Sequence, residues 1–293
     1  MVSENFLPKL LAAWCLVIVC AGCSAETTPK TLTLATFNME WLGDNTPDDR
    51  KIRTEADMKL LAEVLRDTEA DICAVQEVEN DAAMKRLLAY LPEYRFVLGA
   101  TGGKQHVGFL YKAAALDVKT LGEVASIAVE PERTRAGYLL QIQQGKAKWL
   151  FLAVHLKSTS RADSTRELEA RSRELRRLQA AQLRVWSDSV LQADSLVRLV
   201  MVGDFNDSPK RKNTSLDTLK NAPHLVFLTR DNTSCTYEGL PAIDHIVCST
   251  QAVKRVRQGS LYTLNLHAML KEQEVKRVSD HCPVICRFDV SEE

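Results

Sequence analysis

From residue 31 onward, apolar residues follow one another along the chain with two different spacings. Short runs that alternate or are rich in β-branched residues predict strands, and apolar positions repeated every three to four residues predict helices. The strand-like runs on either side of Gln144-Gly145 are joined by a tight turn, which predicts an antiparallel hairpin. Strands are expected at residues 31–38, 71–77, 106–112, 137–143, 148–155, 197–204, 243–249 and 282–290.

Helix-like spacing is clearest at residues 54–69, where apolar side chains repeat on one face behind Thr54, a typical N-cap residue. Further helices are expected at residues 81–91, 164–191 and 215–222. Because hairpins and helices are both present and no linker divides them, the pattern predicts one mixed α/β domain with packed sheets.

The N-terminal segment has a different pattern. Lys9 precedes an apolar run at residues 10–21, which is too short to span a bilayer and is typical of a signal-peptide core. The run ends in small residues before Cys23, and this resembles the site at which bacterial lipoproteins are cleaved and acylated. We therefore expect lipidation at Cys23, with an ordinary cleaved signal or a weak anchor as the alternatives.

These features predict the organisation of the chain. A signal peptide of lipoprotein type is expected at residues 1–22, a short tether at 23–30 and a single domain at 31–293. All three interpretations of the N-terminal segment export the domain.

The composition is that of an ordinary globular protein of 293 residues, 45% hydrophobic and 26% charged. Lys and Arg together number 38, as do Asp and Glu, so the formal net charge is zero. A strongly basic balance would indicate charge-driven binding to nucleic acid. Its absence argues against tight binding of that kind but leaves a phosphate-ester substrate open.

Five cysteines follow Cys23, and an exported domain can pair some of them. Because the number is odd, at least one is expected to stay unpaired unless it bonds another chain. Cys73 lies in an apolar run and is predicted to be a small core residue. The sequence leaves open which disulfides form among Cys73, Cys235, Cys248, Cys282 and Cys286.

Polar residues collect where the predicted strands begin or end. Read singly, a segment such as 203–209 is a typical turn, since Gly, Asp, Asn and Pro are the usual turn residues. Antiparallel neighbours, however, bring the end of one strand beside the start of another, so that one rim can collect them all. The residues are Asn38, Glu40, Glu77, His155, Lys157, Asp204 and Asn206 after strands, and Asp244, Asp280 and His281 at or before the start of strands.

Together these side chains suit the hydrolysis of a phosphate ester. Their carboxylates and amides are hard oxygen donors, which favour Mg²⁺, Mn²⁺ or Ca²⁺ over Zn²⁺. His155 and His281 can exchange protons near neutral pH, and Asp244 is suited to orient one of them. A hard metal, histidine and amide donors together are typical of metal-assisted phosphoester cleavage.

Six short motifs occur between residues 31 and 288: TFNMEWL, DICAVQEV, VHLKS, GDFND, IDHIV and SDHCPV. In this order the chain resembles the endonuclease/exonuclease/phosphatase superfamily, which includes pancreatic-type deoxyribonuclease, exonuclease III, inositol polyphosphate 5-phosphatases and neutral sphingomyelinases. The resemblance implies a deoxyribonuclease I-like α/β (α+β) fold, a four-layer αββα sandwich of two mostly antiparallel sheets flanked by helices.

The resemblance also implies roles for the oxygen donors. Glu77 matches the principal metal-ligating glutamate, and Asp280 matches a further acid on the metal side. Glu40 matches a secondary acidic position, and Asn38 matches the asparagine that hydrogen-bonds the active-site water or phosphate. We expect these four residues at the metal site, with Mg²⁺ as the cofactor and Mn²⁺ or Ca²⁺ as substitutes.

The catalytic residues implied by the resemblance are His155, Asp204, Asn206, Asp244 and His281. His155 would stabilise the phosphoryl oxygens, and Asp204 would position or activate the attacking water. Asn206 would hold the phosphate. Asp244 would pair with His281, and His281 would act as a base or stabilise the phosphate. Whether Asp204 or His281 takes the proton stays open.

Two further residues are candidates for substrate binding. Arg135 falls where members of the superfamily often carry an arginine before a strand, and a solvated loop residue is the alternative. Lys157 shares a strand face with His155, and a surface lysine is the alternative.

The expected function is that of an exported, divalent-metal-dependent phosphodiester hydrolase, with a nuclease acting on DNA or RNA favoured. The segment IDHIV resembles secreted bacterial nucleases more than inositol 5-phosphatases. The alternatives are a phosphatase or phosphodiesterase acting on a lipid headgroup or small sugar phosphate, and a binding module with an inactive site. We expect a monomer held by its lipid at a membrane, facing the periplasm or the cell exterior.

Overall fold

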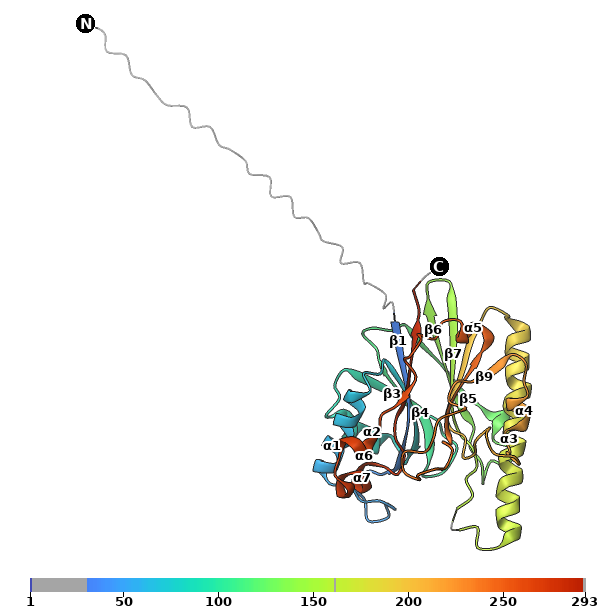
Figure 1. Ribbon diagram of the computed structural model, residues 1–293. Coiled ribbons are helices and arrows are strands. Elements are labelled where there is room, and N and C mark those ends of the chain that lie inside the picture. The colour runs from blue at the N-terminus through green and yellow to red at the C-terminus, as the bar shows by residue number, and fades with distance from the viewer. Residues whose placement is uncertain (2–30, 161, 292–293) are drawn as a thin grey trace.

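The computed structural model describes residues 31–160 and 162–291, together with Met1. The predicted signal peptide, the tether and the lipidation site at Cys23 lie outside the described residues. Two sheets pack face to face, and helices lie on both outer sides (Figure 1). Within the described ranges, no helix has the length and apolar character needed to cross a bilayer.

The first sheet has six strands in the order β11-β12-β1-β2-β4-β3. Their bounds are Tyr262–Thr263 (β11), Val284–Asp289 (β12), Thr31–Leu42 (β1), Ile72–Val78 (β2), His106–Lys112 (β4) and Tyr94–Leu98 (β3). The helices on its outer side are α1 (Glu55–Asp67), α2 (Asp81–Leu88), α6 (Leu266–Met269) and α7 (Glu272–Val278) (Figure 1). As predicted, Thr54 caps α1, because its hydroxyl accepts a hydrogen bond from the backbone N–H of Asp57.

The second sheet also has six strands, in the order β5-β6-β7-β8-β10-β9. Their bounds are Val118–Val124 (β5), Gly137–Gln144 (β6), Ala147–His155 (β7), Arg198–Asp204 (β8), Asp244–Ser249 (β10) and Leu225–Phe227 (β9). The long helix α3 (Arg166–Ala193) and the short α4 (Asp217–Lys220) pack against its outer side (Figure 1). A 3₁₀ turn at Ala125–Ile127 follows β5, and α5 (Thr250–Val253) follows β10 directly.

The central core lies between the sheets. Trp149 and Phe151 of β7 contribute from the second sheet, and Phe109 and Phe288 contribute from the first. The rings of Trp149 and Phe288 meet edge to face with centroids 5.3 Å apart, a geometry that aromatic pairs prefer. Separate apolar clusters seat the helices on the two outer faces. The predicted αββα sandwich is thereby confirmed.

Two strand pairs are parallel, β1 with β2 and β7 with β8, and the other pairs among the described strands are antiparallel. The carboxyl ends of parallel neighbours lie at the same edge of a sheet. The ends of β1 and β2 therefore meet in one sheet, and the ends of β7 and β8 meet in the other. Polar residues at these four ends form the rim that carries the candidate site.

The predicted strand list missed β3, β5, β9 and β11, and these four are the edge strands of the two sheets. An edge strand packs against one neighbour and leaves many of its side chains in solvent. In β5, for example, no residue is fully buried. Such strands therefore lack the apolar run by which the inner strands were recognised.

The first strand also extends further than the predicted 31–38. It reaches Leu42 through an interruption of its pairing with β2, between Asn38 and Leu42. Glu40 and Trp41 lie in this interruption with φ angles of 42° and 56°, a left-handed conformation that is uncommon for residues other than glycine. Irregularities of this kind redirect side chains, and they recur beside active sites.

Candidate active site

The strand register places three of the predicted residues in one row. His155, the last residue of β7, pairs with Asp204, the last residue of β8. Asp204 pairs in turn with Asp244, the first residue of β10. Across the sandwich, Asn38 on β1 lies beside the end of β2, which carries Glu77 as its penultimate residue. The predicted rim is therefore assembled from both sheets.

Asn38 joins the two halves of this rim. Its Nδ2 donates to Oε1 of Glu77 at 3.2 Å and to Oδ2 of Asp204 at 3.1 Å. Its own Oδ1 accepts from the backbone N–H of Glu40 at 3.0 Å, and the side chain is fully buried. One amide therefore holds carboxylates from opposite sheets at a fixed separation.

His155 faces these carboxylates as a neutral ring. Its Nε2 lies 3.6 Å from Oδ2 of Asp204 and 3.8 Å from Oε1 of Glu77. Neither ring nitrogen has a hydrogen-bond partner within residues 31–160 and 162–291, although the residue is only 2% exposed. Burial, reinforced by the positive charge of Arg135, holds the pKa of His155 well below its usual value. A buried imidazole without a hydrogen bond costs stability, so its presence at the rim indicates a functional role for His155.

The pKa of Asp204 is shifted in the opposite direction, upward. Burial, followed by the negative charge of Asp244, raises the pKa of Asp204 to about 7 from an ordinary 3.8. Its Oδ1 accepts a hydrogen bond from the backbone N–H of Asn206 at 2.7 Å, which fixes the carboxyl group. A carboxyl group with a pKa close to neutrality can take up and release a proton under ordinary conditions.

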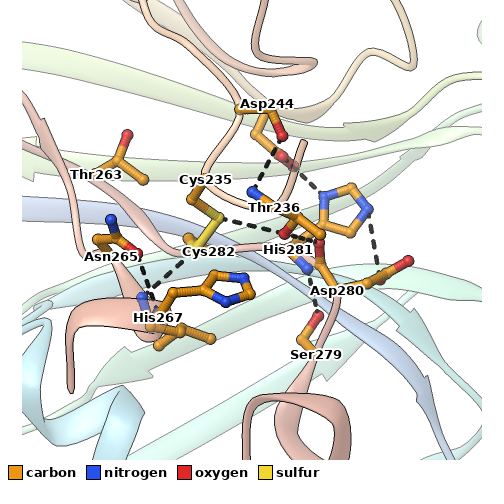
Figure 2. Close-up of a disulfide and its surroundings, with 12 residues drawn as sticks. Cys235, Thr236, Asp244, Thr263, Asn265, His267, Ser279, Asp280, His281 and Cys282 are labelled. Carbon is orange, nitrogen blue, oxygen red and sulfur yellow. Dashed lines mark hydrogen bonds and ion pairs between the residues drawn. A yellow bond between two sulfur atoms is a disulfide. The ribbon is translucent and has the colours of Figure 1, made fainter. Parts of the chain in front are cut away.

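His281 and Asp244 form a hydrogen-bonded pair across the site (Figure 2). The distance from Nδ1 of His281 to Oδ2 of Asp244 is 2.8 Å, and Nε2 points toward Oδ2 of Asp204 at 3.8 Å. Burial opposes the charged ring, but the charge and hydrogen bond of Asp244 outweigh it and raise the pKa of His281 well above 6.5. His281 is therefore an imidazolium at neutral pH, whereas His155 is neutral.

Replacing Asp244 with asparagine is expected to lower the pKa of His281, because the group that stabilises the imidazolium loses its charge. A pKa raised in the folded state gives stability that is present below pH 6.5 and is lost as the pH rises through the folded value. The variant should therefore be destabilised most below pH 6.5, with the difference fading at alkaline pH. An NMR titration of the His281 ring checks the first point, and an unchanged pKa would contradict it.

Glu40 and Asp280, the other two predicted acidic ligands, lie at the border of the site and contact neighbouring groups there. The carboxylate of Glu40 is ion-paired with Lys51, and its Oε2 also accepts from the backbone N–H of Asp280 at 2.9 Å. The side chain of Asp280 is 49% exposed, and its Oδ1 lies 3.9 Å from Nε2 of His281. Both residues border the site, but Glu77 and Asp204 lie closer to its centre.

Asn206 and the two basic candidates are also at the rim. The amide of Asn206 donates to the carbonyl of Leu156 at 3.0 Å, which ties the turn after β8 to the end of β7. Arg135 is buried and donates to the backbone carbonyl of Gln105 at 3.0 Å. Nζ of Lys157 donates to the carbonyl of Ser158 at 2.8 Å.

A cleft of about 730 Å³ opens beside Glu77, and both basic candidates line it. Trp41, Arg50 and Arg133 line it as well, and the sequence pattern did not single out the two arginines. The guanidinium of Arg50 lies over the Trp41 ring, 4.5 Å from its centroid. The cleft therefore offers cationic and aromatic groups next to the predicted metal ligand.

Arg53 is a site-supporting residue that the sequence pattern did not reveal. The side chain is 1% exposed and donates to the backbone carbonyls of Met39, Glu40 and Trp41 in the irregular end of β1. It also donates to the carbonyl of Val278 at 2.8 Å, at the end of α7. One guanidinium thus satisfies the carbonyls of two segments that flank the site.

Replacing Arg53 with methionine is expected to lower the free energy of unfolding by about 3 kcal/mol or more, because several buried carbonyls lose their donor at once. Arg50→Met is the matched control, since Arg50 is exposed and contributes a cation–π contact of about 0.5–1 kcal/mol. Urea unfolding of both variants measures the difference. Equal losses in the two variants would contradict the role of Arg53.

The donor set fits a hard divalent cation. Glu77 and Asp204 present carboxylate oxygens within reach of one amide. Asp204 and Asp244 lie in one group with His281, with one atom of each within 4.8 Å of the others, but His281 as an imidazolium offers no lone pair to an ion. Oδ1 of Asp244 is buried and has no hydrogen-bond partner among the described residues. A second acidic group, formed by Asp44, Asp49 and Glu79, lies apart from these residues and is bordered by Lys104.

The comparisons agree with this fold and identify the family. The model of the endonuclease/exonuclease/phosphatase family matches residues 35–281, and no curated protein sequence matches the chain. A solved structure of truncated TDP2 from Caenorhabditis elegans has a TM-score of 0.63 at 16% identity, covering 88% of this chain and 97% of that chain.

Two further solved structures have the same fold. The human nocturnin catalytic domain, with a bound sulfate, has a TM-score of 0.59 at 15% identity, covering 88% of this chain and 94% of that chain. The mannosyl-6-phosphatase of Bacteroides thetaiotaomicron has a TM-score of 0.57 at 15% identity, covering 87% and 98%. Because the family model spans most of the chain, the protein belongs to the endonuclease/exonuclease/phosphatase family.

Proposed function

We propose that this protein is a divalent-metal-dependent phosphodiester hydrolase and that nucleic acid is its substrate. Membership of the family supports a hydrolase acting on phosphoester bonds. The observation that carries the proposal is that three groups with differently shifted pKa values meet at one rim. They are His155, which is neutral, Asp204, whose pKa is about 7, and His281, which is hydrogen-bonded to Asp244.

The metal site proposed here is centred on Glu77. The side-chain NH₂ of Asn38 links the carboxylate of Glu77 to that of Asp204, and Asp280 and Glu40 border the site. Mg²⁺ typically binds one or two carboxylates together with substrate phosphate, which matches this sparse donor set. Such an ion supplies charge neutralisation at a phosphoryl oxygen and at the leaving alkoxide.

The residues of the chain perform the remaining steps. Asp204 orients a water molecule and takes its proton as the water attacks phosphorus in line with the leaving oxygen. His281, held as an imidazolium by Asp244, stabilises the negative charge that builds on the phosphoryl oxygens, and the N–H of neutral His155 donates to the same group. Asn206 steadies the turn that carries Asp204 and offers its amide to the phosphate.

The cleft beside Glu77 supports a diester over a monoester. Its volume of about 730 Å³ lies within the range of ligand sites and exceeds what a single phosphate needs. Arg133, Arg135 and Lys157 line it, so a chain that continues beyond the scissile phosphate would meet cations. A small sugar phosphate is the second candidate, because a mannosyl-6-phosphatase has the same fold.

Export is part of the proposal. The Cys235–Cys282 disulfide supports it, because disulfides persist in oxidising compartments. The lipid-anchored form with Cys23 acylated, facing the periplasm or cell exterior, remains the proposed state of the mature chain. A binding module with an inactive site is disfavoured, since each catalytic position predicted from the motifs carries a side chain able to act.

The test is to incubate the full chain with supercoiled plasmid and Mg²⁺ or Mn²⁺, with and without EDTA, beside Asp204→Ala and His281→Ala. Bis-p-nitrophenyl phosphate and the p-nitrophenyl monoester are offered in parallel. Metal-dependent nicking that both variants lose supports the nuclease. Turnover of a small ester without nicking moves the assignment to a lipid or sugar phosphate, and inactivity on all three substrates refutes the proposal.

A further inference from the structure

We propose that Cys235, Thr236 and Cys282 are positioning residues for His281, so that hydrolysis requires the Cys235–Cys282 disulfide. The inference rests on the proposed function, because it assumes that His281 acts on the phosphate. It adds a dependence on the redox state of a bond that lies outside the catalytic residues. The starting observation is that Cys282 follows His281 directly and is joined to a loop 47 residues earlier in the chain.

On its N-terminal side, the His281 segment is held by the first sheet. The hydroxyl of Ser279 donates to the carbonyl of Asn38 at 2.7 Å and accepts from the backbone N–H of His281 at 3.0 Å. The backbone N–H of Asp280 donates to Glu40. These contacts fix the approach of the chain to His281 from α7. Beyond His281, the backbone N–H of Leu266 donates to Sγ of Cys282 at 3.5 Å, and the backbone N–H of Leu264 donates to the carbonyl of Pro283 at 2.8 Å.

On its other side, the segment is held by the loop that carries Cys235 and Thr236 (Figure 2). The disulfide fixes Cys282, and the hydroxyl of Thr236 donates to the carbonyl of Asp280 at 2.6 Å. His281 therefore stands between two residues that are both tied to the same loop. In this view the ring of His281 lies beside Asp244, next to that attachment.

The loop itself is well suited to serve as an anchor. The hydroxyl of Ser234 accepts from the backbone N–H groups of Thr236 and Tyr237 at 3.2 Å and 3.0 Å. The backbone N–H of Ser234 donates to the carbonyl of Leu240 at 2.8 Å, which closes the loop on itself. Because the loop is closed by its own hydrogen bonds, its attachment through the disulfide and Thr236 restricts the movement of Asp280 and His281.

The hydrogen bond between His281 and Asp244 depends on this anchor and tolerates little displacement. The 2.8 Å bond from His281 to Asp244 joins the two sheets, because Asp244 begins β10 and His281 precedes β12. Displacing a catalytic group by about 1 Å can cost about 10²-fold in rate. Reduction by a dithiol converts the disulfide to two thiols, while the reductant forms its own disulfide. Two electrons and two protons are transferred, and His281 then loses its covalent anchor.

The experiment measures kcat and KM of the full chain on bis-p-nitrophenyl phosphate with Mg²⁺, before and after treatment with dithiothreitol. A thiol titration confirms reduction, and circular dichroism confirms that the protein stays folded. We expect reduction to lower kcat by about 10-fold or more with a smaller change in KM, and reoxidation to restore it. Cys235→Ser should show the same loss, and dithiothreitol should have no further effect on it.

Thr236 provides a test that leaves the disulfide intact. Thr236→Val, which lacks the hydroxyl, is expected to lower kcat by roughly threefold to tenfold, and Thr236→Ser should restore the wild-type value. An unchanged kcat in reduced, folded protein would overturn the proposal. If reduction unfolds the chain, equal kcat values for Thr236→Val and wild type would overturn it instead. The oxidised wild type and Asp204→Ala are assayed in parallel. If the wild type is active and Asp204→Ala is not, the proposed function stands and only the role of the disulfide is overturned.

Discussion

Asp204→Asn is expected to lower kcat by about 10³-fold or more, the largest effect of any single substitution at the site. The change keeps the size of the side chain but removes a carboxyl group whose pKa is raised to about 7. Asparagine cannot accept a proton from the attacking water. The remaining hydrogen bonds from Asn38 and the turn at Asn206 can be rearranged, so the fold should persist. Steady-state kinetics on bis-p-nitrophenyl phosphate measure the loss.

The same substitution is expected to stabilise the metal-free protein at alkaline pH. A carboxyl group with a raised folded pKa gives stability that is present below its ordinary value of 3.8 and is lost as the pH rises through about 7. Asparagine does not ionise, so the variant avoids that loss. Its melting temperature should exceed that of the wild type at pH 8 in EDTA and approach it at pH 4. A lower melting temperature at pH 8 would contradict the destabilising effect of burying the ionised Asp204 carboxylate beside Asp244.

Asp207→Asn is the matched control, since it changes another buried aspartate in the same turn. Burial opposes the ionised form of Asp207, but hydrogen bonds from the backbone and hydroxyl of Ser215 outweigh it and lower the pKa. A lowered pKa gives stability above 3.8 that is lost as the pH falls through the folded value. This variant should therefore lose stability at neutral pH, the opposite sign to Asp204→Asn.

Glu77→Gln is expected to abolish tight binding of Mg²⁺ or Mn²⁺ and to lower kcat/KM by about 10²-fold or more at fixed metal concentration. Glutamine retains the shape of the side chain but not the charge, and divalent hard cations bind carboxylates far better than amides. Glu77 has a φ of 59°, and glutamine meets the same backbone strain, so the comparison isolates the charge. Isothermal titration with Mn²⁺ measures the binding, and plasmid nicking measures the activity.

Glu79→Gln is the control for this prediction, because it removes the same charge two residues further along the chain. Glu79 belongs to the second acidic group and is paired with Lys104 at 2.6 Å. The Glu79→Gln variant is expected to keep both its metal affinity and its activity near those of the wild type. Loss of metal binding in Glu79→Gln but not in Glu77→Gln would move the metal to the second group and refute the site at Glu77.

Much of the site could be predicted from the sequence because its residues stand at the ends of recognisable strands. Apolar runs end at His155 and Asp204, and a further polar residue, Lys157 or Asn206, stands two positions later. The order of the motifs indicated the family and its αββα sandwich; the family match confirms the first and the structure confirms the second. Local patterns of this kind are readable since side-chain alternation and strand length depend on neighbouring residues.

The tertiary structure decided which of these groups are partnered. Glu40 matches an acidic motif position, yet Lys51 and the backbone of Asp280 occupy its carboxylate. Arg53 belongs to no motif, yet it holds two segments that lie more than 220 residues apart in the chain. The cysteines left open by their spacing resolve into one bond between Cys235 and Cys282. Cys73 is buried, as predicted, and is not part of a disulfide.

The perturbed pKa values have the same origin. The sequence places Asp204, Asp244 and His281 on separate strands or turns and says nothing of their distances. Only the register of β8 with β10 and the packing of the two sheets bring them together in a buried space. Charge interactions and desolvation depend on separation and burial, which are properties of the assembled sandwich. The sequence by itself thus determined the chemical groups and their places on strands, and the packing of the two sheets determined their protonation.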